Sequence, residues 1–105
     1  MDKSEWLRGA VVNACADDYE DFVRVAAVVK NFAQEDGVQV REEEIRTGIE
    51  LALAEGLIKC YELSAHEPFR REVELDMSRL VEFGQYFYVT AKGKEFLLAK
   101  DAKEI

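Results

Sequence analysis

The sequence predicts an α+β fold, mostly helical, in which three N-terminal helices precede a small antiparallel sheet and a C-terminal helix. Two observations support this prediction. Apolar residues recur at helical spacing through the first half of the chain. Near its end, the stretch YFYVTAKGKEFLLAK alternates as a strand does and then changes to helical spacing after a threonine. At 105 residues, 49% of them hydrophobic, the chain is expected to form one domain over residues 1–105 with one core.

The first two predicted helices cover residues 2–16 and about 19–35. In the first, one apolar stripe comprises Trp6, Leu7, Ala10, Val11, Ala14 and Cys15. Asp17 or Asp18 is expected to cap the second helix, because an aspartate side chain accepts hydrogen bonds from the unpaired N–H groups of a first turn. Gly37 is expected to end it, since glycine adopts a left-handed conformation at no steric cost.

A third helix is predicted over about 41–55 and a strand over 57–63. Ile45, Ile49 and Leu53 lie on one face of this helix, and Gly56 follows its end. Its first turn contains three consecutive glutamates, which are favourable at the positive end of the helix dipole. The strand LIKCYEL is short and rich in β-branched and aromatic residues.

Residues 64–85 are the least regular part of the chain and contain its single proline. Asp76 is a candidate N-cap for a short helix over 77–83, which Gly84 would end. In the strand that follows, Phe87 and Val89 are expected on one face and Tyr86 and Tyr88 on the other.

Thr90 is expected to cap the last helix, over about 91–102. Gly93, in its first turn, would remove a side chain where the helix approaches the sheet. A strand that turns sharply into a packed helix needs threonine and glycine at these positions for geometry, so neither residue is interpreted as catalytic.

Two stretches resemble small single-domain winged helix-turn-helix proteins of bacteria. One is IRTGIELALAEGLIKCYEL, a helix running directly into a strand, and the other is YFYVTAKGKEFL, a strand, threonine, glycine and helix. Together they cover about residues 40–63 and 86–98. The resemblance implies a wing sheet and a third helix that lies in the DNA major groove. The DNA contacts that it implies are Arg46, Thr47, Arg70 and Arg71.

The charge of the chain opposes that use. The formal net charge is −8 and the pI is near 4.7, so a polyanion approaches against the mean field unless basic residues gather on one face. The solvent side of the third helix carries Glu43 and Glu50, with Glu44 beside them, and Arg46 as its one basic residue. We therefore expect DNA binding to be disfavoured.

Aromatic residues crowd the two strands and their connection, and about half of them are expected in the core. The others would form a surface that binds protein partners. The residues assigned to this surface are Tyr61, Phe69, Phe83, Tyr86 and Tyr88. The preferred hypothesis is a non-enzymatic winged-helix module that acts through protein contacts, as a homodimer or an accessory subunit. The alternative is a DNA-binding transcriptional regulator that binds duplex DNA as a dimer.

The sequence offers no pattern for catalysis, a cofactor or a metal site. Its one histidine, His66, and two distant cysteines, Cys15 and Cys60, do not form a zinc set. The cysteines are expected to be buried and reduced. No apolar run approaches the roughly 20 residues that span a bilayer, and a cytoplasmic location is expected.

Overall fold

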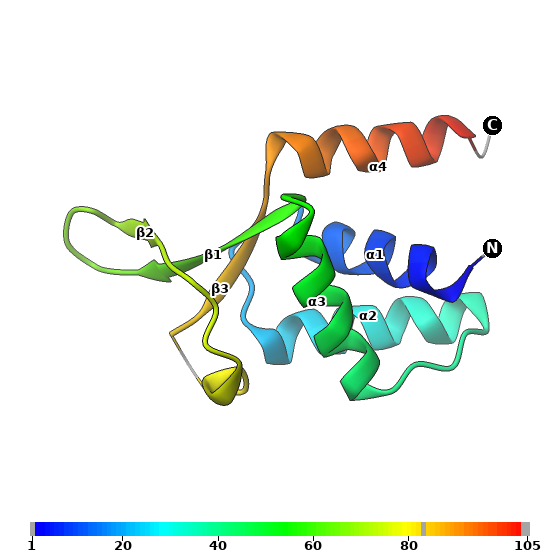
Figure 1. The fold of residues 1–105 in the computed structure, drawn as a ribbon, viewed down its shortest axis with the longest axis horizontal. Coiled ribbons are helices and arrows are strands. Elements are labelled where there is room, and N and C mark those ends of the chain that lie inside the picture. The colour runs from blue at the N-terminus through cyan, green and yellow to red at the C-terminus, as the bar shows by residue number, and fades with distance from the viewer. Residues whose placement is uncertain (1, 83, 104–105) are drawn as a thin grey trace.

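The computed structural model describes residues 2–82 and 84–103. Three helices come first, a sheet of three strands follows, and a fourth helix ends the chain (Figure 1). The helices are α1 (Lys3–Ala14), α2 (Phe22–Asp36), α3 (Glu42–Ala54) and α4 (Ala91–Lys103). The strands are β1 (Ile58–Leu63), β2 (Arg70–Glu72) and β3 (Tyr86–Val89), and a 3-10 turn, η1 (Met77–Arg79), precedes β3. This order confirms the fold class expected from the sequence.

The start of α2 differs from the expectation. Its N-cap is Asp21, whose carboxylate accepts a hydrogen bond from the Arg24 N–H at 2.9 Å, so the assignment of the cap to Asp17 or Asp18 was wrong. The cap lies later because Glu20 pairs with Phe87 of β3, each backbone N–H donating to the other residue's carbonyl at 3.0 and 2.8 Å. The link between α1 and α2 therefore joins the free edge of β3 through one isolated bridge.

The sheet has the order β2-β1-β3, with both pairs antiparallel. Strand β2 was not expected. It lies inside the connection 64–85 and returns along the free edge of β1, where Tyr61 pairs with Glu72. The short helix expected over 77–83 is wrong in extent, because the helical turn covers 77–79 alone, with Asp76 accepting from the Ser78 N–H at 3.1 Å.

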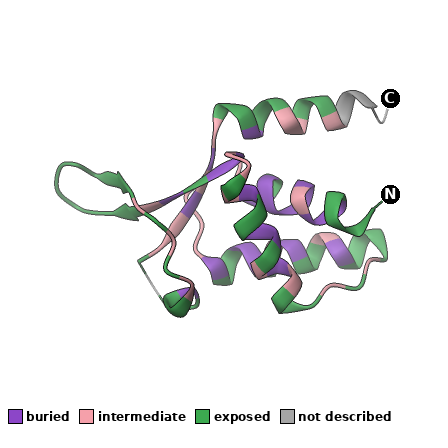
Figure 2. Ribbon diagram, viewed as in Figure 1, coloured by how far each residue is buried: buried purple, intermediate pink, exposed green. Residues whose placement is uncertain are grey.

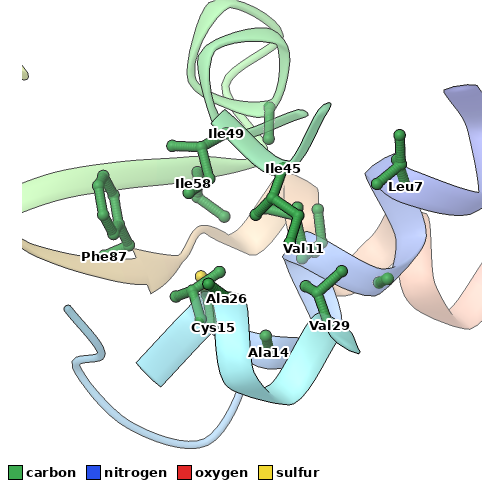
Figure 3. Packing of buried hydrophobic residues seen from close by; sticks show 14 of the residues in the cluster. Leu7, Val11, Ala14, Cys15, Ala26, Val29, Ile45, Ile49, Ile58 and Phe87 are labelled. Atoms are coloured by element: carbon green, nitrogen blue, oxygen red, sulfur yellow. The ribbon is translucent and has the colours of Figure 1, made fainter. Parts of the chain in front are cut away.

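The core lies between the three N-terminal helices and one face of the sheet. Figure 3 shows Val11 of α1, Ile45 and Ile49 of α3, and Phe87 of β3 pointing into the same interior, and all four are fully buried. The alternation expected for the last strand is confirmed, since Phe87 and Val89 are buried while Tyr86 and Tyr88 are half-buried on the other face. Within the described residues, no helix combines the length and apolar character that crossing a membrane requires.

A compact junction joins the end of β3, the start of α4 and the start of β1. The Thr90 hydroxyl donates to the Gly56 carbonyl at 2.6 Å and accepts from the Gly93 N–H at 3.0 Å. Thr90 is thus the helix cap that the sequence predicted. A Cβ on Gly93 would lie 2.1 Å from the Leu57 carbonyl oxygen and 2.7 Å from Val89 Cγ2, so no other residue fits without moving the helix.

We expect Gly93→Ala to lower the free energy of unfolding by about 2 kcal/mol or more, because the added methyl group meets backbone that cannot move aside. Gly9→Ala is the matched control: its Cβ would meet the flexible end of the Lys100 side chain, and alanine favours a helix interior by about 1 kcal/mol. Urea unfolding followed by circular dichroism compares the two. Equal stability of the variants would contradict this account of the junction.

Candidate interaction surfaces

The outer face of α3 is accessible, as expected for a helix that presents one side to a partner. Glu42, Glu43, Thr47 and Glu50 are exposed. The Arg46 side chain is 38% exposed, its guanidinium carbon lies 5.4 Å from the centre of the Phe22 ring, and its nearest paired carboxylate is Glu42, at 4.0 Å. The Phe22 ring therefore holds the Arg46 guanidinium in position, and the distant Glu42 carboxylate offsets only a small part of its charge.

Thr47, the other helix residue assigned to DNA, already uses its hydroxyl within the helix. The hydroxyl donates to the Glu43 carbonyl one turn earlier, at 3.1 Å. Its lone pairs and methyl group remain available on the exposed face.

Basic residues from outside α3 neutralise two of its three first-turn glutamates. Arg41 Nη1 lies 3.0 Å from Glu43 Oε1, and Lys3 Nζ of α1 lies 2.9 Å from Glu44 Oε2. The hydrogen bond from Lys3 is the main reason why the pKa of the Glu44 carboxyl is lowered, and the Arg41 backbone N–H adds to it. Glu43 and Glu50 are exposed to solvent, as expected. The sequence did not indicate the basic partners of Glu43 and Glu44, whereas Glu50 has no ion pair within the described residues.

The two wing arginines of β2 differ in their surroundings. Arg71 forms an ion pair with Glu62 across the hairpin. Arg70 has no carboxylate partner among the described residues; its guanidinium instead donates to the hydroxyl of Tyr19 and lies over two aromatic rings, 5.9 Å from the centre of Tyr19 and 5.8 Å from that of Tyr61. Of the three arginines assigned to DNA, Arg70 is the one whose charge is not offset by a carboxylate within 4 Å among the described residues.

All four tyrosines of the chain lie on or beside the face of the sheet that is turned away from the core. Tyr61, Tyr86 and Tyr88 meet there because β1 pairs Tyr61 with Tyr86 and Lys59 with Tyr88. The Tyr19 ring stacks on the Tyr88 ring, with 4.6 Å between their centres, and meets the Tyr61 ring edge-on, with 5.4 Å between centres. All four are half-buried, so this surface is a packed cluster with an accessible rim.

Sequence reasoning missed Tyr19, which it placed at the start of the second helix. A signal was present: Asp21 followed by an apolar residue is as good a capping pattern as Asp17 or Asp18. A helix that begins after Asp21 leaves Tyr19 in the preceding link, free to reach the sheet.

The end of the β1–β2 hairpin carries apolar side chains in the open. Phe69 is 60% exposed, and Leu63, which pairs with the adjacent Arg70, is 43% exposed. Figure 2 shows the whole hairpin end as accessible. Phe69 is thus separate from the tyrosine cluster, although the sequence assigned them to one surface. Phe83, assigned to the same surface, lies outside the described residues.

Comparisons with known proteins identify the fold. No family model and no curated protein matches the chain. One solved structure, a PadR family transcription regulator from hypervirulent Clostridium difficile, matches 93% of this chain and 85% of its own, with a TM-score of 0.61 and 16% sequence identity. The chain has a winged helix-turn-helix fold. This confirms the resemblance drawn from residues 40–63 and 86–98.

In this winged helix, β1 and β3 are the strands that frame the wing, and the described residues between them, 64–82 and 84–85, form the wing itself. The N-terminus of α3 and the wing lie clear of α4, which runs along the opposite edge of the molecule from the start of α3 (Figure 1). Arg46 and Thr47 on the helix and Arg70 and Arg71 on the wing therefore belong to parts of the fold that α4 does not cover.

The described residues contain no cluster of three histidine, cysteine, aspartate or glutamate side chains close enough to hold a metal ion. The cysteines, the most reactive side chains of the chain, are shielded from solvent. Both cysteines are free and buried, as expected. Burial raises the pKa of the Cys15 thiol from its ordinary 9.0 to about 12, with Glu20 adding to the effect, and burial raises that of Cys60 to about 11. Neither thiol is a nucleophile near neutral pH.

We expect stability to fall as pH rises above about 9. The unfolded Cys15 thiol ionises near 9.0 while the folded thiol stays protonated to about 12. Its stabilising contribution is therefore complete below 9 and is lost through the window from 9 to 12, by about 1 kcal/mol between pH 9 and 10. Urea unfolding of the parent and of Cys15→Ala at these two pH values isolates this contribution, and equal pH dependence of the two proteins would contradict it.

Proposed function

We propose that this chain is a DNA-binding transcriptional regulator that contacts duplex DNA through the exposed face of α3 and through its wing. The observation that carries the proposal is the match in fold, over nearly the whole chain, to a protein described as a transcription regulator. The proposed role is binding, with no catalytic step.

The chain is acidic, but ion pairs at the start of α3 offset part of the negative charge there, which supports the proposal. Arg41 and Lys3 offset Glu43 and Glu44 at the start of α3, where a phosphate backbone would pass. A net charge of −8 still limits affinity, because nonspecific binding comes almost entirely from neutralised phosphates. We therefore infer a regulator that contacts few phosphates and depends on the fit between helix and groove.

The four assigned residues then divide by role. In this proposal Arg46, whose guanidinium lies over the Phe22 ring, contacts a base edge or a phosphate from α3, and Thr47 contributes its methyl group beside it. Arg70 can contact a phosphate from the wing without first breaking an ion pair. Arg71 must exchange Glu62 for phosphate, which reduces its net contribution.

We expect retention of duplex DNA at low salt that weakens with added salt. About three phosphate contacts predict a slope near −3 in a plot of log affinity against log salt concentration. Arg70→Glu with Arg71→Glu should abolish retention, since it replaces two attractive contacts by two repulsive ones. Fluorescence anisotropy with a labelled random duplex measures both effects.

The matched control is Lys30→Glu with Lys94→Glu, which changes net charge by the same amount on α2 and α4, away from the start of α3 and the wing. We expect this variant to keep most of the parent's affinity. Equal losses in the two double variants would show that only net charge matters, and failure of the parent to bind any duplex at low salt would refute the proposal.

A second candidate function is protein binding through the wing tip, as a self-associating or accessory module. The specific observation in its favour is that the hairpin end carries two exposed apolar side chains, Phe69 at 60% and Leu63 at 43%. Large apolar side chains that project from a surface are typical of protein contacts.

If the tip binds a second copy, the weight-average mass will rise with concentration in light scattering. Phe69→Ser with Leu63→Ser should then suppress the rise, because it removes the apolar area that drives association. Val23→Ser is the matched control, since Val23 on α2 is also 60% exposed. A monomeric mass for the parent at all concentrations would count against self-association through this surface.

A further inference from the structure

The end of the β1–β2 hairpin, residues 62–72, has no core of its own. Every residue in this range is exposed, and Figure 2 shows the hairpin end projecting from the body. Its polar contacts are mostly internal: Glu62 pairs with Arg71, and the Ser64 N–H donates to the Phe69 carbonyl at 2.9 Å. Strand pairing alone leaves such a hairpin free to twist and bend relative to the helices.

Among residues 62–72, one side chain forms a hydrogen bond with the body beyond the sheet. Arg70 reaches across the outer face of the sheet and donates to the Tyr19 hydroxyl, with its guanidinium near the rings of Tyr19 and Tyr61. This hydrogen bond favours the charged form, so it raises the pKa of Arg70. Within the described residues, no other hydrogen bond or ion pair joins residues 62–72 to the helical part of the chain.

Tyr19 is fixed to the body through the residue that follows it, and a local hydrogen bond shapes the link at the residue before it. Asp18 accepts from the Tyr19 backbone N–H at 2.8 Å, and Glu20 forms the two-way backbone pair with Phe87. Its ring stacks on Tyr88 at 4.6 Å with an interplanar angle of 29°. The hydroxyl that receives Arg70 is therefore held by β3 and by the link that leads into α2.

We propose that Tyr19 is a positioning residue that holds the wing in one direction relative to α3, by way of Arg70. The inference deepens the proposed function and rests on it for the DNA measurements alone. A guanidinium held by a hydroxyl and two rings restricts the β2 end of the hairpin, which pairing with β1 does not do by itself. With the wing fixed, α3 and the wing meet a duplex as one preformed surface, and less freedom is lost on binding.

The first test measures wing direction without DNA. Spin labels at Ser64→Cys on the hairpin and Lys30→Cys on α2 report a distance distribution by pulsed electron resonance, and the buried native cysteines leave the new thiols as the reactive ones. We expect one narrow distribution in the parent and a broad one in Tyr19→Ala. Tyr19→Phe, which keeps the ring and loses the hydroxyl, should lie between them.

Arg70→Lys and Arg79→Lys form a matched pair for the partner side chain. Both exchange an exposed arginine for lysine within the connection 64–85, but only Arg70 contacts the tyrosines, whereas Arg79 pairs with Glu82. We expect the distribution to broaden in Arg70→Lys alone. If Tyr19→Ala does not fold, Tyr19→Phe and Arg70→Lys, which leave the packing nearly intact, decide the question.

The second test measures duplex affinity by anisotropy. Tyr19→Ala should weaken duplex binding about two- to fivefold, which is the range expected for the loss of an exposed cation–π contact. Tyr19 carries no charge, and its loss removes no phosphate contact. The salt slope should therefore stay at the parent's value. A changed slope with an unchanged distance distribution would overturn the proposal.

The two proposals fail in different ways. If the parent binds no duplex, the proposed function is wrong, and the distance distributions alone decide whether Tyr19 holds the wing. If the parent binds duplex and the distributions of parent, Tyr19→Ala and Arg70→Lys coincide, the positioning role is wrong while the function stands.

Discussion

The structure depends on one short junction, where the chain leaves β3 and enters α4. The carbonyls of Gly56 and Leu57, at the end of the turn after α3, receive hydrogen bonds from the hydroxyl and backbone N–H of Thr90. Gly93 lets the first turn of α4 lie directly against the Leu57 carbonyl. Three elements distant in sequence therefore share one contact point, and none can shift along its axis without breaking it.

That junction sets the register of β1 against β3, and the register places the tyrosines. Because Lys59 lies opposite Tyr88 and Tyr61 opposite Tyr86, the polar face of the sheet collects aromatic rings, while Cys60 and Phe87 face the core. A slip of one residue would invert both faces. The link before α2 then adds Tyr19 to the outer layer through its backbone pair with Phe87. The candidate surfaces are thus consequences of the packing on the opposite side of the same strands.

Local signals in the sequence were sufficient for the presence of the four α-helices, for β1 and β3, and for the caps at Gly37 and Thr90, though not for the N-cap of α2. Thr90, Gly37 and the alternation from Tyr86 to Val89 act within a few residues, so spacing alone predicts them. The ion pair between Lys3 and Glu44 joins residues 41 positions apart, and no local pattern announces it. Strand β2 was missed for a similar reason: its three residues, Arg-Arg-Glu, are all exposed and lack the apolar alternation of a strand that packs on a core.

The charge counted along a segment of sequence also differs from the local charge at the surface that a binding partner contacts. Glu43, Glu44 and Glu50 on the solvent side of α3 suggested repulsion of phosphates. Glu43 and Glu44, however, are opposed by Arg41 and Lys3 at about 3 Å. Conversely, Arg71 looks available in sequence and is paired with Glu62. Arg70 is the case that sequence could not distinguish from its neighbour. It is held by aromatic rings and a neutral hydroxyl, so it is fixed in direction without losing its charge.

A guanidinium has five N–H donors, and the bond to Tyr19 uses one Nη1 donor. The remaining donors can meet a phosphate while the tyrosines keep the side chain extended, so holding the wing and contacting DNA do not compete. Under the proposed function, an acidic chain can bind DNA through a small number of basic groups, provided that these groups are held in position before binding. A preformed arginine loses less rotamer freedom for each hydrogen bond than a mobile lysine does, which offsets part of what a small number of phosphate contacts costs in affinity.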